Sequence, residues 1–151
     1  MQVWKFGGTS VGKPERMKSI RQLITEDGQP KIVVLSALSG STNTLLSISE
    51  SLNSGNQTEA KVKATELRAH YDQFLTELYS TPAGLGKGQA IVEKEFNFID
   101  SLIATAPYTG KQEKEMVALG ELLSTQIFEA FLQEEGVSSA LLPALDFMVI
   151  D

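Results

Sequence analysis

The residues best suited to chemistry stand at the start of the chain, where a lysine precedes a glycine pair and two hydroxyl side chains. Lys5 is followed by Gly7 and Gly8, and then by Thr9 and Ser10. Glycine permits a backbone with positive φ and lets a ligand approach the amides closely. The amides and dipole at the start of a following helix attract an anion, and lysine adds a full positive charge. This order predicts a turn that holds phosphate groups.

Two general phosphate-binding patterns do not fit this turn. The dinucleotide pattern G-x-G-x-x-G is excluded because Thr9 stands where its second glycine should be. The pattern G-x-x-x-x-G-K-[ST] fits from Gly7 through Lys13, but Pro14 has no hydroxyl group to hold Mg²⁺. Pro14 is instead suited to the first position of a helix. A plain tight turn between a strand and a helix therefore stays open as the alternative to a phosphate site.

Two further places carry groups that fit a ligand. Residues 36–43 are rich in hydroxyl groups and follow a second apolar stretch, so in a parallel sheet they leave the same edge as the glycine turn. Gly120 interrupts a helical pattern at a cost of about 1 kcal/mol relative to alanine, which indicates a close approach by another segment. Glu121 follows amid apolar neighbours, where a carboxylate needs a partner. For residues 36–43, the alternative without a function is a capped connection between a strand and a helix. For Glu121, it is an exposed helical glutamate.

The hydrophobic pattern predicts the elements that position these groups. A first strand before Gly7, an amphipathic helix at 14–27 and a strand at 31–35 form one β-α-β unit, in which 31–35 should be buried on both faces. We expect Thr42 or Asn43 to cap the next helix.

Helices dominate the rest of the chain. No strand is expected between residues 53 and 110, where helices are predicted at 58–79 and 89–104 around a break at 81–86. The longest helix is expected at 111–135, with Gly136 ending it. Two short strands are expected in the tail, at 139–142 and 147–150. His70 is expected on the surface, and the aromatic residues of these helices in the core.

Composition restricts the classes of function. The 151 residues carry a net charge of −6, which argues against general binding to nucleic acids or anionic membrane surfaces. The absence of cysteine excludes a disulfide framework. No apolar run approaches the ~20 residues of a membrane span. An anionic nucleotide remains compatible, because local positive charge at a loop outweighs a diffuse negative surface.

Three motifs, in the same order along the chain, resemble those of the aspartokinases within the amino-acid kinase superfamily. They are KFGGTSVG at residues 5–12, VLSALSGSTN at 34–43 and GELLST at 120–125. The resemblance implies an α/β fold, a three-layer αβα sandwich with a mainly parallel sheet, similar to that of carbamate kinase. It implies further that residues 1–151 form the N-terminal part of a kinase domain, with a helical insertion at about 44–110.

The resemblance also implies an activity: transfer of a phosphoryl group from ATP to the side-chain carboxylate of L-aspartate, giving 4-phospho-L-aspartate. This reaction is the entry to lysine, threonine and methionine biosynthesis. By motif position, the residues at the β- and γ-phosphates would be Lys5, Gly7, Gly8, Thr9 and Ser10. Lys5 would also be catalytic, because it offsets charge on the transferred group, and Mg²⁺ would bridge the phosphates.

For the acceptor, the resemblance implies that Ser36 and Thr42 bind the aspartate carboxylates and that Glu121 pairs with its ammonium group. Such an acceptor is already ionised at neutral pH, so phosphoryl transfer to it needs positioning and charge neutralisation but no general base. The match departs in one place: the family commonly has an acidic residue two turns before Glu121, whereas this chain has Lys114, with Glu115 beside it.

The kinase domain of the family is longer than this chain. Its later half supplies much of the adenine pocket, an arginine for the substrate carboxylate and a catalytic aspartate, and regulatory domains follow. We therefore expect a piece of a longer protein that is inactive, or nearly so, by itself. The resemblance implies a cytoplasmic enzyme that is a homo-oligomer in its full length.

Three alternatives stay open. The acceptor could be glutamate, an acylated amino acid or a carbamate, as in other amino-acid kinases. The chain could instead be a non-catalytic nucleotide-binding module with a regulatory role. It could also be an assembly segment whose C-terminal apolar run forms the interface.

Overall fold

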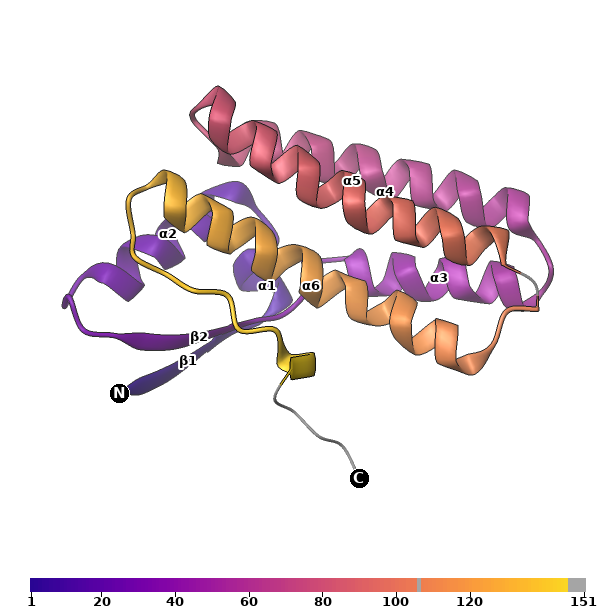
Figure 1. Ribbon diagram of the computed structural model, residues 1–151, viewed down its shortest axis with the longest axis horizontal. Coiled ribbons are helices and arrows are strands. Elements are labelled where there is room, and N and C mark those ends of the chain that lie inside the picture. The colour runs from indigo at the N-terminus through magenta and orange to yellow at the C-terminus, as the bar shows by residue number, and fades with distance from the viewer. Residues whose placement is uncertain (106, 147–151) are drawn as a thin grey trace.

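A parallel pair of strands and a bundle of long helices share one apolar core. The computed structural model describes residues 1–105 and 107–146. In chain order the elements are β1 (Gln2–Phe6), α1 (Gly8–Val11), α2 (Pro14–Thr25), β2 (Lys31–Leu35), α3 (Ser41–Asn53), α4 (Gln57–Leu78), α5 (Pro82–Ala104), α6 (Gly110–Glu134) and the 3₁₀ turn η1 (Ala144–Asp146). Figure 1 shows the strands and α2 at one end of the bundle that α3–α6 form.

The sheet consists, in the described residues, of β1 and β2 paired in parallel, with Gln2 opposite Lys31 and Phe6 opposite Leu35. The connection through α2 confirms the predicted β-α-β unit. One face of the sheet meets the core through Trp4, Phe6, Val33 and Leu35. The other face is open, and its exposed apolar residues are Val3, Ile32 and Val34.

The prediction that residues 31–35 are buried on both faces is therefore wrong. Ile32 is 39% and Val34 44% exposed, so burial along β2 alternates instead of being continuous. The reason is the placement of the helices, which all lie on the same side of the two strands in Figure 1. A strand that is covered on one face only keeps the period of two that the pleat imposes.

The amphipathic helix after the first strand forms as predicted. Pro14 is at its first position, and Met17, Ile20 and Ile24 are buried. Leu23, which was expected on the same face, is 47% exposed. Gly28 adopts a φ of 64° just beyond the helix, a left-handed conformation that favours glycine.

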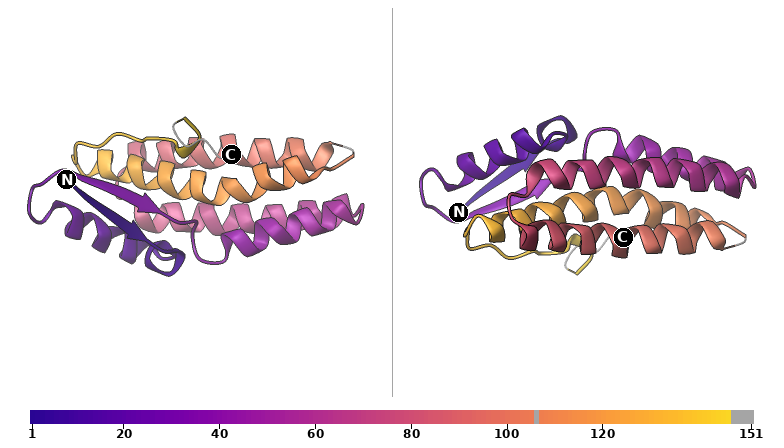
Figure 2. Two further views of the ribbon diagram at one scale, coloured as in Figure 1. Left: turned by 90° about the horizontal axis from the view of Figure 1, so that it is seen from below. Right: turned by 90° about the horizontal axis from the view of Figure 1, so that it is seen from above.

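The four long helices alternate in direction and close into a ring, in which α3 contacts α4, α4 contacts α5, α5 contacts α6, and α6 contacts α3. Figure 2 shows the bundle from below and from above. The stripe predicted for the last helix is buried throughout, at Met116, Leu119, Leu123, Ile127 and Phe131. Across the described residues, none of the helices is both long and apolar enough to cross a membrane.

The aromatic residues of the bundle are buried, with one exception. Tyr71, Phe74 and Phe96 are at most 3% exposed, which confirms their prediction as core residues, whereas Phe98 is 39% exposed. His70 is exposed, as predicted.

Two predictions about element boundaries are wrong. The helix expected from residue 89 already begins at Pro82, since the Thr81 hydroxyl accepts a hydrogen bond from the Gly84 amide and caps it. Residues 139–142 form no strand; the Ser139 hydroxyl instead donates to Glu129 on α6. The second predicted tail strand, at 147–150, lies outside the described residues.

Glu134, near the end of α6, fixes the start of α5. Its carboxylate accepts hydrogen bonds from the Thr81 hydroxyl at 2.5 Å, the Thr81 amide at 2.8 Å and the Ser80 amide at 3.2 Å. Partial burial opposes ionisation of this carboxyl group, but these hydrogen bonds outweigh it, and the pKa of Glu134 lies below its ordinary value. The side chain also leaves no room for a Cβ atom at Gly84.

We expect Glu134→Gln to lower the free energy of unfolding by about 1–2 kcal/mol at pH 7, because an amide accepts these hydrogen bonds more weakly than a carboxylate. The folded-state pKa is depressed, so the contribution is present above the pKa of the unfolded chain and is lost as the pH falls. Urea unfolding should thus show a difference that shrinks below a pH of about 4. Exposed Glu93→Gln serves as the control; a difference for Glu134→Gln that is the same at pH 7 and pH 3 would contradict the assignment.

Candidate active site

The glycine turn that follows β1 has a different backbone from the predicted one. Gly8–Val11 form a single helical turn, α1, and the amides of Ser10 and Val11 donate to the Gly7 carbonyl at 2.9 and 3.2 Å. Gly7 has a φ of −78° and Gly12 a φ of −74°, and Gly8 is not among the glycines with positive φ. None of these three glycines therefore uses the positive φ that glycine permits. The first amides of a helical turn, here those of Gly8 and Thr9, have no acceptor within the turn.

The glycines of the turn are needed for close packing. A Cβ atom at Gly8 would lie 3.0 Å from the Ala37 carbonyl oxygen, and one at Gly12 would lie 2.6 Å from Cβ of Ser39. Any larger residue at these positions would push away the loop that follows β2. The two loops that the sequence places at one edge of the sheet are thus in van der Waals contact.

Gly120 meets the same loop from the opposite side. A Cβ atom there would lie 2.8 Å from Cβ of Ala37, 3.5 Å from Leu45 and 3.8 Å from the Thr42 hydroxyl. This confirms the prediction that another segment approaches α6 closely at Gly120. Ala37, which is 3% exposed, therefore contacts both the glycine turn and α6, whereas Ser39 contacts the glycine turn and is exposed.

Hydrogen bonds fix both ends of this loop. The Ser36 amide donates to the Phe6 carbonyl at 3.0 Å, and its carbonyl accepts from the buried Ser124 hydroxyl of α6 at 2.8 Å. The Ser41 hydroxyl accepts from Tyr71 of α4 at 3.0 Å. The sequence analysis did not identify Ser124 or Tyr71 as partners of the loop. No local pattern relates Ser124 to Ser36, which is 88 positions away, or Tyr71 to Ser41, which is 30 positions away.

The helix after the loop begins earlier than predicted. Its N-cap is Gly40, with a φ of 86° and no capping side chain, so neither Thr42 nor Asn43 caps it. Glycine takes this left-handed conformation without strain and lets the chain turn directly into α3. Thr42 therefore lies in the first turn of α3, half-buried, with its hydroxyl toward Gly120.

Two cations flank the glycine turn. Lys5 is exposed on the open face of the sheet, and its Nζ lies 3.9 Å from the Cβ position of Gly7. The guanidinium group of Arg16, in the first turns of α2, donates a hydrogen bond to the Thr9 carbonyl. Arg16 was also missed; the available signal was an arginine one turn into the helix that follows the glycines. Both charges favour an anion at the turn.

Glu121 is exposed, as in the alternative of an exposed helical glutamate, so its carboxylate needs no buried partner. Gly120, beside it, is the buried residue of the pair. Burial raises the pKa of Tyr71 to about 12, and the negative charge of Glu121 adds to that rise.

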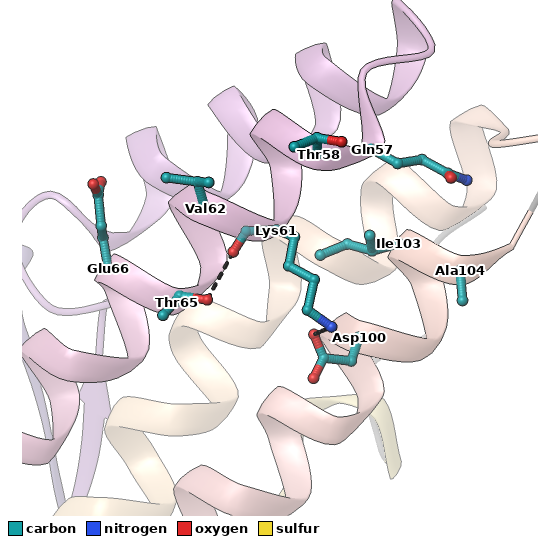
Figure 3. Close-up of a pocket in the computed structure, with 9 residues that line it drawn as sticks. All are labelled: Gln57, Thr58, Lys61, Val62, Thr65, Glu66, Asp100, Ile103 and Ala104. Atoms are coloured by element: carbon teal, nitrogen blue, oxygen red, sulfur yellow. Dashed lines mark hydrogen bonds and ion pairs between the residues drawn. The ribbon is translucent and has the colours of Figure 1, made fainter.

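Two surface hollows lie away from these residues. One, of about 590 Å³, is between α4 and α5, where Ile103 lines it and Lys61 pairs with Asp100 at 3.8 Å (Figure 3). The other, of about 580 Å³, is lined by α5, α6 and residues 139–141. Neither contains a predicted site residue. Within the described parts of the chain, no group of three or more histidine, aspartate or glutamate side chains is placed to hold a metal ion.

Comparison with known proteins decides the family. The family model described as "Amino acid kinase family" matches residues 1–149. The chain belongs to the amino acid kinase family. Aspartokinase 2, chloroplastic, of Arabidopsis thaliana is 33% identical over 141 residues, which are 89% of this chain and 25% of that protein. Lysine-sensitive aspartokinase 3 of Escherichia coli is 30% identical over 138 residues, or 91% of this chain and 29% of that protein.

A solved structure of the family has the same fold. E. coli aspartokinase III in complex with aspartate and ADP superposes with a TM-score of 0.69 at 29% identity, over 90% of this chain and 29% of that chain. This match confirms the predicted α/β amino-acid kinase fold, of which the chain holds an incomplete part. The chain spans between a quarter and three-tenths of the length of these relatives.

Gly120→Ala tests the close contact between α6 and the loop. Alanine favours a helix by about 1 kcal/mol over glycine, but the clash with Ala37 should outweigh this and lower the free energy of unfolding by about 1–3 kcal/mol. Gly86→Ala is the matched control, since a Cβ atom at Gly86 in α5 would meet nothing within 4 Å. It should raise stability by about 0.5–1 kcal/mol. Equal effects of the two substitutions in urea unfolding would show that the contact is absent.

Proposed function

We propose that this chain is the N-terminal part of an aspartokinase, with a helical insertion at about 44–110. The proposed reaction is the transfer of the γ-phosphoryl group of ATP to the side-chain carboxylate of L-aspartate. The observation that carries the proposal is the meeting of the three motif segments at residues 37–42. The similarity to an aspartokinase that was solved with aspartate and ADP supports it.

The nucleotide phosphates would bind at the glycine turn. In this proposal the amides of Gly8 and Thr9, which have no acceptor within the turn, face the β- and γ-phosphates, with Gly7 and Ser10 beside them, and Lys5 neutralises charge there. The position of Lys5 Nζ next to Gly7 supports this role. The turn, Lys5 and Arg16 together fit a polyanion. Mg²⁺ would be held through the phosphate oxygens and would neutralise part of their charge.

The amino acid would bind on the other side of the loop. Ser36 and Thr42 would donate hydrogen bonds to its carboxylates, and Glu121 would pair with its ammonium group. The contact of Ala37 with both Gly8 and Gly120 supports this arrangement, because it brings the elements that carry Thr42 and Glu121 next to the glycine turn. The two ligands would then meet across one short segment.

The chemistry requires charge control more than proton transfer. A carboxylate oxygen of aspartate attacks the γ-phosphorus, the bond to the β-γ bridging oxygen breaks, and ADP leaves. The acceptor is ionised at neutral pH, so no proton must be removed. Lys5 stabilises the negative charge that is redistributed toward the bridging oxygen.

The proposal also includes a cytoplasmic location and homo-oligomeric assembly of the full-length enzyme, for which the family resemblance is the support.

Lys5→Ala tests the nucleotide side. Loss of a charge-assisted contact should weaken binding of Mg–ATP by about ten- to a hundredfold, as measured by isothermal titration calorimetry. Lys61→Ala, which removes a lysine from the far end of α4, should leave the affinity unchanged. If both variants bind Mg–ATP as the unaltered chain does, the glycine turn is not the phosphate site.

The 151-residue chain by itself should turn over at most a trace of substrate. It covers about a quarter of the length of its aspartokinase relatives, whose later parts would complete the site. A coupled assay of ADP release with L-aspartate, L-glutamate and a carbamate as acceptors measures this. Turnover with aspartate at rates of about 1–100 s⁻¹, which are typical of kinases, would contradict the expectation. A preference for another acceptor would replace aspartate in the proposal.

A further inference from the structure

Tyr71 on α4 places a hydroxyl group at the start of α3. The residue is fully buried, at 0% exposure, and its hydroxyl donates to Ser41 Oγ at 3.0 Å. Its ring meets Phe96 of α5 edge to face, with 5.9 Å between centroids. Packing on the ring and the hydrogen bond together hold the phenol in one orientation.

Ser41 is the residue at which the loop becomes a helix. It is 1% exposed, its amide donates to the Leu38 carbonyl at 3.0 Å, and it stands between Gly40 and Thr42. Gly40, with a φ of 86°, takes the left-handed conformation at which the chain turns into α3. The hydrogen bond from Tyr71 fixes this turn from the bundle.

The phenol keeps its proton at neutral pH. Burial raises the pKa of Tyr71 to about 12, the bond to Ser41 acts in the opposite direction, and the charge of Glu121 raises the pKa further. The hydroxyl therefore remains a donor. Its environment includes both Ser41, next to Thr42, and Glu121, which stand on the two elements that would hold the amino acid.

We propose that the Tyr71 hydroxyl is a positioning group for the acceptor side of the active site. It fixes Ser41, and with it the turn of α3 that carries Thr42, at a set separation from Glu121, without touching the substrate. This inference rests on the proposed function, because it assigns Thr42 and Glu121 to the amino acid. It predicts a loss that is selective for the amino acid over the nucleotide.

A second tyrosine, in the connection between α5 and α6, provides a control because it also bonds to a serine of α3. The Tyr108 hydroxyl bonds with Ser49 Oγ at 2.8 Å, farther along α3. Tyr108→Phe removes a tether between α3 and a neighbouring segment, as Tyr71→Phe does, but at a distance from Thr42. Comparison of the two separates positioning of the site from general anchoring of α3.

The experiment measures binding of L-aspartate and of Mg–ATP to the 151-residue chain by calorimetry. Tyr71→Phe should weaken aspartate binding about three- to tenfold, the value of one lost neutral hydrogen bond, and leave Mg–ATP binding within about twofold. Tyr108→Phe should leave both affinities within about twofold. Ser41→Ala should have the effect of Tyr71→Phe, and the double variant should be no weaker than either, since both remove the same bond.

Unchanged aspartate affinity in Tyr71→Phe would overturn the proposal, as would an equal loss for both ligands or an equal effect of Tyr108→Phe. If the unaltered chain binds no aspartate, the proposed function loses its support from this chain. Hydrogen exchange of the amides at 38–44 then decides the positioning role independently. Exchange about three- to tenfold faster in Tyr71→Phe than in Tyr108→Phe supports it, and equal rates overturn it.

Discussion

The structure depends on one close contact: residues 37–39 pass between two surfaces that only glycine can provide. Gly8 and Gly12 form one surface, and Gly120 forms the other, with Cβ positions between 2.6 and 3.0 Å from loop atoms. A methyl group at any of the three positions would separate elements that must be adjacent if a phosphate and its acceptor are to meet. The contact brings together two glycine-containing motifs that are more than a hundred residues apart in the sequence.

The helical bundle makes this contact rigid. The Ser124 hydroxyl from α6 and the Tyr71 hydroxyl from α4 hold the two ends of the loop, and both side chains are completely buried. The cations near the glycine turn, Lys5 and Arg16, are by contrast exposed and available to an anion. Buried polar groups that hold the loop, together with exposed charges near it, would suit the proposed phosphoryl transfer, since catalysis of that reaction is largely positioning.

Local patterns in the sequence predicted much of this arrangement. The first strand, the helix that begins at Pro14 and the buried stripe of α6 have strong periodicity, and all of them form. The cost of Gly120 inside a helix indicated its close contact correctly. The β2 strand was misjudged because a run of apolar residues does not reveal how many faces are covered. The sequence did not reveal that the glycines of the turn serve close packing, because a glycine needed for space and one needed for positive φ look identical in a sequence.

Contacts over long sequence separations could not be predicted. Neither Tyr71 nor Ser124 stands in a pattern that links it to the loop, and the exposure of Glu121 depends on which face of α6 the bundle leaves open.

The most direct test of a shared site at this loop is a solution NMR titration of the amide resonances with Mg–ATP and, separately, with L-aspartate. We expect Mg–ATP to shift residues 7–10, aspartate to shift Thr42 and Glu121, and both ligands to shift residues 37–39. Shifts confined to other regions, such as the hollow between α4 and α5, would contradict a shared site at this loop.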